Sequence, residues 1–283
     1  MKLSGVKLVS VFKVVLLTLT ACASSPNIEQ RTITSNQLAT HHGWKSVVIV
    51  TNLFDLMSYQ PKQINAATIL TVYIEGDGFA WRTRSIPSTD PTPINPIGLK
   101  LALNHPDGNA AYLARPCQYT SGNNVRGCEK TYWTDKRFSE DVIAASNQAI
   151  TALKEKFGAT QLQLVGYSGG GAVAALLTAR RSDVIRLITV AGNLDHHAWT
   201  DAKQISPLTG SLNPADYWQA LSNIEQVHFT GGNDLIIGNV VAQSYKQHFS
   251  DDGEISIISL PNFDHHCCWV EQWNRLSTPY LIH

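Results

Sequence analysis

Ser168 lies between glycines in a sequence pattern that could make its hydroxyl a nucleophile. The pentapeptide Gly166-Tyr167-Ser168-Gly169-Gly170 follows the apolar run 162–165 and precedes an alanine-rich segment at 172–179. This order predicts a strand, a sharp turn and a helix, with the Ser168 hydroxyl exposed at the helix N-terminus. Such a hydroxyl could attack a carbonyl carbon. A phosphate-binding loop is the alternative, but no Lys follows as a Walker loop requires, and the glycines lack dinucleotide spacing.

A serine hydroxyl needs a histidine to take its proton and a carboxylate to orient that histidine. When the nucleophile sits in such a turn, the acid and then the histidine follow it along the chain. Asp234 comes directly after an expected strand at 226–231 and the turn Gly232-Asn233, so it is the predicted acid. Asp195, which follows the preceding strand, competes with it, and a turn-capping role for Asp234 is the structural alternative.

The histidine should lie in the loop after the last strand, and two adjacent residues compete for the role. That loop contains Asp264-His265-His266, and the residues from Cys267 onward are typical of a helix. We favour His265 because it begins the turn. His196 and His197 are weaker candidates, since they precede Asp234 and would break the expected order.

An oxyanion formed during acyl transfer also needs backbone donors. The amide of Gly169 is one candidate, and the segment Glu75-Gly76-Asp77-Gly78 supplies the second from Asp77 or Gly78. Two carboxylates beside an anion site are unfavourable. They are therefore expected to bond to Arg82, Arg84 or Arg115, or to select a cationic substrate group; a plain glycine-rich turn is the structural alternative.

The elements that must position these residues alternate between strands and helices. Strands are expected at 46–51, 68–75, 110–114, 161–166, 184–191, 226–231 and 255–260, and helices at 139–157, 170–181, 240–249 and 269–276. Several strands are apolar on both faces, as buried parallel strands are. The pattern predicts an α/β fold with a mostly parallel, doubly wound sheet in a single domain. Segments 79–107 and 194–221 are expected to be long loops over the carboxyl ends of the strands.

The first residues differ in character from the rest of the chain. Lys2, Lys7 and Lys13 precede an apolar run at 14–19, which is the layout of a secretory signal. Leu19-Thr20-Ala21-Cys22 resembles a bacterial lipoprotein box, in which cleavage precedes an acylated cysteine. We therefore expect a signal peptide at 1–21, a lipidated Cys22, a polar tether at 22–43 and a folded domain at 44–283. An ordinary signal or an uncleaved anchor is the alternative.

The four remaining cysteines form an even set, as expected of disulfides in an exported chain. Cys117 and Cys128 are the preferred pair, because the intervening segment is rich in Gly and Asn and can turn back. Cys267 and Cys268 would form a vicinal bridge or remain free thiols. A zinc site with the neighbouring histidines is less favoured, because two successive ligands rarely close one tetrahedral shell. No metal is expected.

Composition excludes some partners. The chain has 22 basic and 22 acidic residues, with no long basic run, so nucleic acid is not an expected partner. At 283 residues and 43% hydrophobic, it can bury a large core. The oligomeric state has no readable signal.

From Trp44 to the C-terminus, the order of these elements resembles the α/β-hydrolase superfamily, and the whole chain is similar to its bacterial lipoprotein members. The resemblance implies hydrolysis of an ester, thioester or amide through an acyl-enzyme on Ser168, without metal or organic cofactor. The substrate would be a small-molecule or lipid-like ester, and the protein would be anchored in the cell envelope, facing the periplasm or the exterior. Acyl transfer by the same residues, and a non-catalytic binding lipoprotein, are the alternatives.

Overall fold

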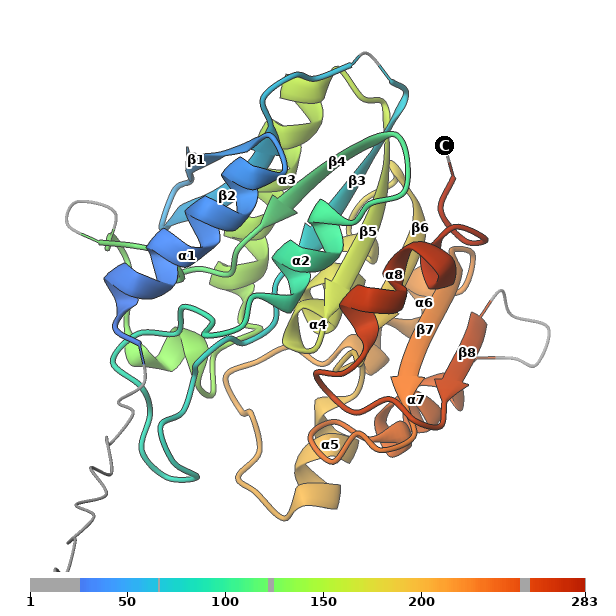
Figure 1. The fold of residues 1–283 in the computed structure, drawn as a ribbon. Coiled ribbons are helices and arrows are strands. Elements are labelled where there is room, and N and C mark those ends of the chain that lie inside the picture. The colour runs from blue at the N-terminus through green and yellow to red at the C-terminus, as the bar shows by residue number, and fades with distance from the viewer. Residues whose placement is uncertain (1–25, 66, 122–124, 250–254, 283) are drawn as a thin grey trace, which may run out of the picture.

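The computed structural model describes residues 26–65, 67–121, 125–249 and 255–282, and places an eight-stranded sheet between two layers of helices (Figure 1). The strands are β1 (Trp44–Val50), β2 (Asp55–Pro61), β3 (Ile69–Ile74), β4 (Asn109–Leu113), β5 (Gln161–Tyr167), β6 (Val184–Val190), β7 (Glu225–Gly231) and β8 (Ile255–Leu260). The α-helices are α1 (Ile28–His41), α2 (Ile97–Leu103), α3 (Glu140–Phe157), α4 (Gly169–Thr178), α5 (His196–Lys203), α6 (Trp218–Leu221), α7 (Asn239–Lys246) and α8 (Trp269–Ser277). Short 3-10 helices span Lys130–Trp133 and Pro214–Tyr217.

The sheet is mostly parallel, as the sequence predicts. Its order is β1-β2-β4-β3-β5-β6-β7-β8, and every pairing from β4 to β8 is parallel. β2 runs antiparallel to both β1 and β4. β2 is not predicted from the sequence, because most of its residues are buried on both faces and show no alternation of polar and apolar residues. The carboxyl ends of the parallel strands meet at one edge, and the loops that carry the candidate site lie there.

Two hydrophobic clusters cover the two faces of the sheet. Alternate residues of a strand point to opposite faces: Val72 packs into the cluster that includes α3 and α4, whereas Tyr73 packs into the cluster that includes α2 and α8. All residues of α4 are buried, and all but the last, Thr178, are apolar or glycine. The helix that follows the Ser168 turn is therefore fixed by packing along its whole length.

The segment expected to be a loose polar tether is instead largely the helix α1, which packs beside β1. Asn27 caps the helix by accepting a 2.8 Å hydrogen bond from the amide of Gln30. The buried positions are Arg31, Ser35 and Ala39, spaced four apart along one face. Because two of these three are polar, the buried face has no hydrophobic periodicity, and a helix is not predicted from the sequence. The predicted signal peptide and Cys22 lie outside the described residues.

Helices also occupy parts of both segments that were expected to be loops. α2 lies within 79–107, and α5 and α6 lie within 194–221. Each is four to eight residues long, too short for a clear apolar period. Among the described residues, no helix combines the length and apolar character needed to cross a bilayer.

Candidate active site

Ser168 occupies the turn between β5 and α4 with a backbone conformation that residues other than glycine rarely adopt. Its φ is +52° and its ψ is −123°. The backbone around it leaves no room for side chains: a Cβ at Gly166 would lie 2.3 Å from the carbonyl oxygen of Gly170. A Cβ on Gly170 itself would lie 2.3 Å from the carbonyl oxygen of Ile74 on β3. The glycines of the pentapeptide are therefore required by close backbone packing, as well as by the turn.

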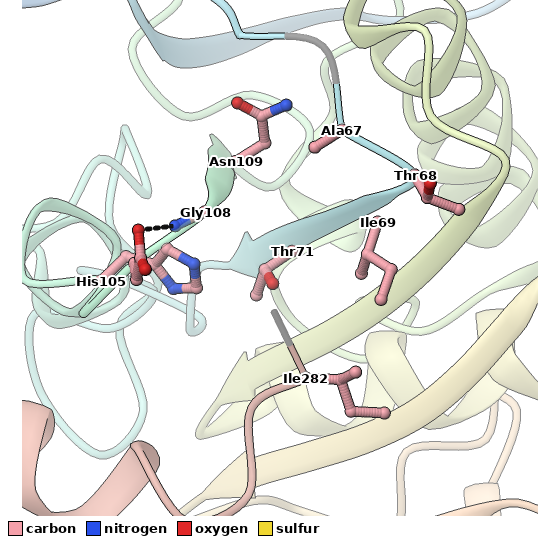
Figure 2. Close-up of a pocket in the computed structure, with 9 residues that line it drawn as sticks. Ala67, Thr68, Ile69, Thr71, His105, Gly108, Asn109 and Ile282 are labelled. Carbon is pink, nitrogen blue, oxygen red and sulfur yellow. Dashed lines mark hydrogen bonds between the residues drawn. The ribbon is translucent and has the colours of Figure 1, made fainter.

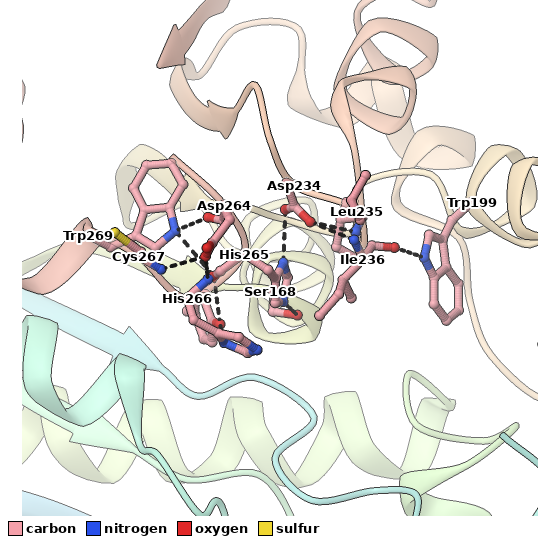
Figure 3. A network of polar contacts seen from close by, with 12 residues as sticks. Ser168, Trp199, Asp234, Leu235, Ile236, Asp264, His265, His266, Cys267 and Trp269 are labelled. Atoms are coloured by element: carbon pink, nitrogen blue, oxygen red, sulfur yellow. Dashed lines mark hydrogen bonds and ion pairs between the residues drawn. The ribbon is translucent and has the colours of Figure 1, made fainter. Parts of the chain in front are cut away.

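The structure brings Ser168, His265 and Asp234 into one hydrogen-bonded chain (Figure 3). The Ser168 Oγ lies 3.0 Å from His265 Nε2, and His265 Nδ1 lies 2.8 Å from Asp234 Oδ2. All three residues are more than nine-tenths buried. These are the contacts that a serine nucleophile, its base and an orienting acid require.

Asp234 lies in the turn after β7, as expected, and its second oxygen is also bonded. Oδ1 accepts from the amides of Ile236 at 2.8 Å and Ile237 at 3.0 Å. Burial by itself raises the pKa of the carboxyl, but His265 and the two amides outweigh burial, so the pKa lies below its usual range. The carboxylate is therefore ionised at neutral pH and holds a proton on His265 Nδ1, which leaves Nε2 free to accept from Ser168.

The competing acid, Asp195, has a structural role. It caps α5 by accepting from the amides of His197 at 3.1 Å and Ala198 at 3.2 Å, and its other oxygen accepts from Ser244 Oγ at 2.6 Å. The next residue, His196, is buried against the ring of Phe138 at 6.3 Å between centroids. Neither histidine of α5 shares a hydrogen bond with Ser168 or Asp234 within the described part of the chain.

His266 contacts the Tyr167 hydroxyl, whereas its neighbour His265 contacts Ser168, and the His265 carbonyl is held by two donors. The Tyr167 hydroxyl donates to the carbonyl of His265 at 3.0 Å and lies 3.2 Å from His266 Nδ1. Trp269 Nε1 donates to the same carbonyl at 3.2 Å and to that of Asp264 at 3.0 Å. These roles of Tyr167 and Trp269 are not predicted from the sequence. The only indication in the sequence is that Tyr167 lies inside the pentapeptide and Trp269 lies four residues after His265.

The acidic segment after β3 is turned so that neither carboxylate is left unpaired. Glu75 is buried, and its carboxylate accepts a hydrogen bond from the amide of Gly76 at 2.9 Å. It also accepts from two amides in the first turn of α2, that of Gly98 at 3.1 Å and that of Leu99 at 3.3 Å. The Tyr112 hydroxyl also donates to it, at 3.1 Å. Burial raises the pKa of Glu75 despite these donors. This buried side chain therefore ties the start of α2 to the end of β3.

Asp77 lies directly beside the first residue of α4. A Cβ on Gly169 would lie 2.0 Å from Asp77 Oδ1. The carboxylate is held by Arg115 Nη1 at 3.2 Å and Arg137 Nη1 at 2.7 Å, both of them buried. Burial raises the pKa of this carboxyl, but the two arginines outweigh it and leave the pKa below its usual range. Arg115 was among the predicted partners, whereas Arg137 was not, and Arg82 and Arg84 are exposed instead.

The main chain of the same segment passes close to the serine. A Cβ on Gly76 would lie 3.2 Å from the Cβ of Ser168, and the Gly76 carbonyl accepts from Gln118 Nε2 at 2.9 Å. Gly78 has a φ of +64°, and a Cβ there would lie 2.0 Å from the carbonyl oxygen of Pro91. Gly169 opens α4, where amides have no partner within the helix. The main chain at Gly76 therefore lies close to Ser168 on one side, and Gly169 follows Ser168 directly at the start of α4.

The cysteines form two disulfides. Cys117 is joined to Cys128, the predicted pair, with Cα atoms 5.6 Å apart. Cys267 is joined to Cys268 between His265 and α8. Of the two alternatives for this pair, a vicinal bridge and free thiols, the structure has the bridge. In the part of the chain that the structure describes, no cluster of three or more His, Cys, Asp or Glu side chains could hold a metal ion.

A separate cavity of about 120 Å³ lies at the opposite edge of the sheet, where β3 and β4 begin (Figure 2). The residues that line it are Ala67, Thr68, Ile69, Thr71, His105, Asp107, Gly108, Asn109 and Ile282. None of them belongs to the Ser168, His265 and Asp234 chain. The cavity is therefore separate from Ser168 and its hydrogen-bonded partners.

Comparison with solved structures places this architecture. An esterase from Pyrococcus furiosus matches with a TM-score of 0.59 at 12% identity, covering 84% of this chain and 89% of its own. An alpha-beta serine hydrolase homologue from Coxiella burnetii matches with a TM-score of 0.56 at 12% identity, over 84% and 97% of the two chains. The chain has the α/β-hydrolase fold. A serine hydrolase without a lid from Xanthomonas campestris matches at 9% identity with a TM-score of 0.54, over 85% and 96%. No protein-family model and no curated protein matches the sequence.

Proposed function

We propose that this protein is a serine hydrolase that cleaves a carboxylic ester, or a related thioester or amide, through an acyl-enzyme on Ser168. The observation that carries the proposal is the hydrogen-bonded chain from Ser168 Oγ to His265 Nε2 and from His265 Nδ1 to Asp234. The fold shared with solved esterases is consistent with it, although fold alone does not choose a reaction.

In the first half of the reaction, His265 Nε2 takes the proton of the Ser168 hydroxyl as Oγ attacks the carbonyl carbon. The oxyanion that forms is stabilised by the amide of Gly169 and by that of Asp77 or Gly78. As the intermediate collapses, His265 gives its proton to the departing alcohol oxygen, and the acyl group remains on Oγ. Asp234 stays ionised throughout and stabilises the imidazolium.

In the second half, a water molecule gives a proton to His265 Nε2 while its oxygen attacks the acyl carbon. The new tetrahedral intermediate expels Ser168 Oγ, which recovers the proton from His265, and the carboxylic acid leaves. The balance is one ester and one water in, one acid and one alcohol out. Neither half of the reaction draws on a metal or an organic cofactor.

Hydrolysis of a short p-nitrophenyl ester by purified protein tests this proposal. Ser168→Ala and His265→Ala should each lower kcat by at least about 10³-fold, because either change removes a member of a group that acts as a unit. His266→Ala is the matched control, since it removes an adjacent imidazole that does not contact the serine, and its kcat should stay within about threefold of the parent. If His266→Ala is the inactive variant, the assignment of the base is wrong.

We also propose that the chain is exported and lipidated at Cys22. The basic start, the apolar run and the Leu-Thr-Ala-Cys sequence support this, and the pairing of Cys117 with Cys128 fits an oxidising compartment. Mass spectrometry of the N-terminal peptide from membranes should find diacylglyceryl-modified Cys22. An unmodified or retained leader would contradict the proposal.

A further inference from the structure

Large apolar side chains are exposed around the edge of the sheet where Ser168 lies. Trp81, Ile86 and Ile94 belong to the segment between β3 and α2, Ile205 follows α5, and Leu235 and Ile236 follow Asp234. These are six of the twelve large apolar side chains exposed in the described residues. Their exposed fractions range from 38% for Trp81 to 85% for Leu235. An apolar rim beside a reactive centre is typical of an interaction surface.

Two of these side chains lie on a defined hairpin. Trp81 pairs with Pro87 in an antiparallel bridge, and the amide of Arg82 donates to the carbonyl of Ile86 at 2.8 Å. The base of the hairpin is closed by the amide of Ser88, which donates to Ala80 at 2.9 Å. Ala80 and Ser88 are buried, whereas every residue from 81 to 86 is exposed. The hairpin is thus a fixed projection with an apolar and basic tip.

The tip carries positive charge. Arg82 and Arg84 lie between Trp81 and Ile86, and no acidic residue occurs from 79 to 89. The next carboxylate, Asp90, is paired with Arg31 of α1 at 3.3 Å. A Trp, an Ile and two exposed arginines on one projection match the headgroup region of an anionic bilayer, where amphipathic aromatic rings and basic side chains are both favoured.

The opposite side of the rim is held with its apolar side chains outward. Trp199 Nε1 donates to the carbonyl of Ile236 at 2.8 Å (Figure 3). Lys203 Nζ donates to the carbonyl of Leu235 at 2.5 Å. With both carbonyls bonded to α5, the Leu235 side chain remains 85% exposed although it directly follows the acid Asp234. Leu235 and Ile236 directly follow the Asp234 that bonds His265, so this part of the apolar rim adjoins the hydrogen-bonded chain of Ser168.

The chain enters the domain at the same end. The first turn of α1 contacts the segment after β3, because Arg31 donates to the carbonyl of Thr92 and lies over the ring of Phe79 at 5.5 Å (Figure 1). Cys22 lies six positions before Ile28, the first residue of α1. Six residues reach at most about 20 Å. An anchor at Cys22 would hold this end of the molecule, and not the opposite one, against a membrane.

We infer that the edge bearing Ser168 docks on the surface of an anionic phospholipid bilayer, with the 81–86 hairpin and the Leu235-Ile236 turn at the headgroup level. The substrate class would then be esters of lipids held in the bilayer, presented to Ser168 without leaving it. The substrate class rests on the proposed function, whereas the docking does not.

Vesicle binding and hydrolysis, measured in parallel, test this inference. The chain from residue 23, which lacks the proposed lipid anchor, is used once a cooperative urea transition shows that it folds. It should sediment with phosphatidylcholine vesicles containing phosphatidylglycerol. Trp81→Ser combined with Ile86→Ser should weaken this binding by about tenfold or more. Arg82→Gln combined with Arg84→Gln should weaken it by about fivefold for each arginine, on anionic vesicles only.

Val48→Ser combined with Val50→Ser is the matched control, because these side chains are 39% and 72% exposed on β1, the edge strand at one margin of the sheet. It should bind vesicles as the parent does. All three double variants should hydrolyse a short soluble ester at the parental rate, whereas the Trp81 and Ile86 variant should lose about tenfold on phosphatidylglycerol in vesicles. Parental vesicle binding by both hairpin variants, or equal weakening in the β1 control, would overturn the docking. Absence of soluble ester hydrolysis in the parent would refute the proposed function while leaving the binding result intact.

Discussion

Replacement of Asp234 by Asn separates the two acids that the sequence left in competition. Asp234 accepts from His265 Nδ1 at 2.8 Å, so its loss should change which ring nitrogen carries the proton. An Asn side chain can turn its NH2 group toward Nδ1, which would then become the acceptor and place the proton on Nε2, facing Ser168. A base whose Nε2 is already protonated cannot accept from the serine. We expect kcat for a p-nitrophenyl ester to fall by about 10⁴-fold, as in serine proteases with the same change, which corresponds to about 5 kcal/mol of transition-state stabilisation.

Asp195→Asn is the control for this experiment. Asn caps a helix about as well as Asp, so the amides of His197 and Ala198 keep their acceptor. The contact with Ser244 is weakened, since an amide accepts less strongly than a carboxylate. We expect a loss of about 1 kcal/mol of stability, measured by urea unfolding, and a kcat within about twofold of the parent. A large loss of kcat in Asp195→Asn, with a nearly active Asp234→Asn, would refute the assignment of the acid.

Four further outcomes follow from the structure. Gly169→Ala should abolish ester hydrolysis in steady-state assays, because the new Cβ would lie 2.0 Å from Asp77 Oδ1 and displace the segment beside the serine; parental kcat would show that this segment is not needed. Asp77→Ala should lower the free energy of unfolding by about 3–5 kcal/mol, because it leaves two buried arginines without their carboxylate, and a change below about 1 kcal/mol in urea titration would contradict this. Replacing Cys117 and Cys128 together by Ser should cost about 3 kcal/mol from the eleven-residue separation that they close; calorimetry should find a lower Tm, and an unchanged Tm would count against the bond. His228 should make the free energy of unfolding depend on pH. Burial lowers its pKa from 6.5 to about 3, so between these pH values only the unfolded chain binds a proton. The free energy of unfolding therefore falls as the pH is lowered through this window, by up to about 5 kcal/mol at pH 3. In His228→Gln the slope of unfolding free energy against pH should be smaller, and an unchanged slope would contradict the assignment.

The three residues of the hydrogen-bonded chain could be singled out from the sequence because local chemistry and chain order indicate them. A strand, the glycines of the pentapeptide and an alanine-rich helix place Ser168 without any long-range information. Asp234 and His265 follow because each ends a parallel strand or begins the next loop, and parallel strands bring these ends to one edge. The choice between His265 and His266 depended only on where the turn begins, and the structure places His265 against Ser168.

Other features depended on contacts between distant parts of the chain. Arg137 reaches Asp77 across 60 positions, and nothing in the neighbourhood of either residue predicts this ion pair. The helix α1 was missed because its buried face is made of Arg31, Ser35 and Ala39, which bond or pack with partners far along the chain. Polar residues that are buried through tertiary contacts carry no periodic apolar signal, so sequence reasoning assigns them to loops.

The two faces of the acidic segment after β3 illustrate the same limit. The sequence indicated that Glu75 and Asp77 would need partners, because two unpaired carboxylates would oppose an oxyanion. It could not indicate that Glu75 would accept hydrogen bonds from backbone amides of α2. Nor could it indicate that Asp77, which lies beside Gly169, would pair with two arginines. The position of α2 decides the first outcome, and α2 was itself hidden in a segment expected to be a loop.

Covalent labelling of Ser168 tests the central claim most directly. The purified protein is incubated with a fluorophosphonate probe, and the modified peptide is identified by mass spectrometry, with Ser168→Ala as the control. An activated serine should be labelled at Ser168 in the parent, and labelling should be lost in both Ser168→Ala and His265→Ala, since the base is needed to activate the hydroxyl. No labelling of the folded parent, or labelling that persists in Ser168→Ala at another residue, would contradict a nucleophilic Ser168.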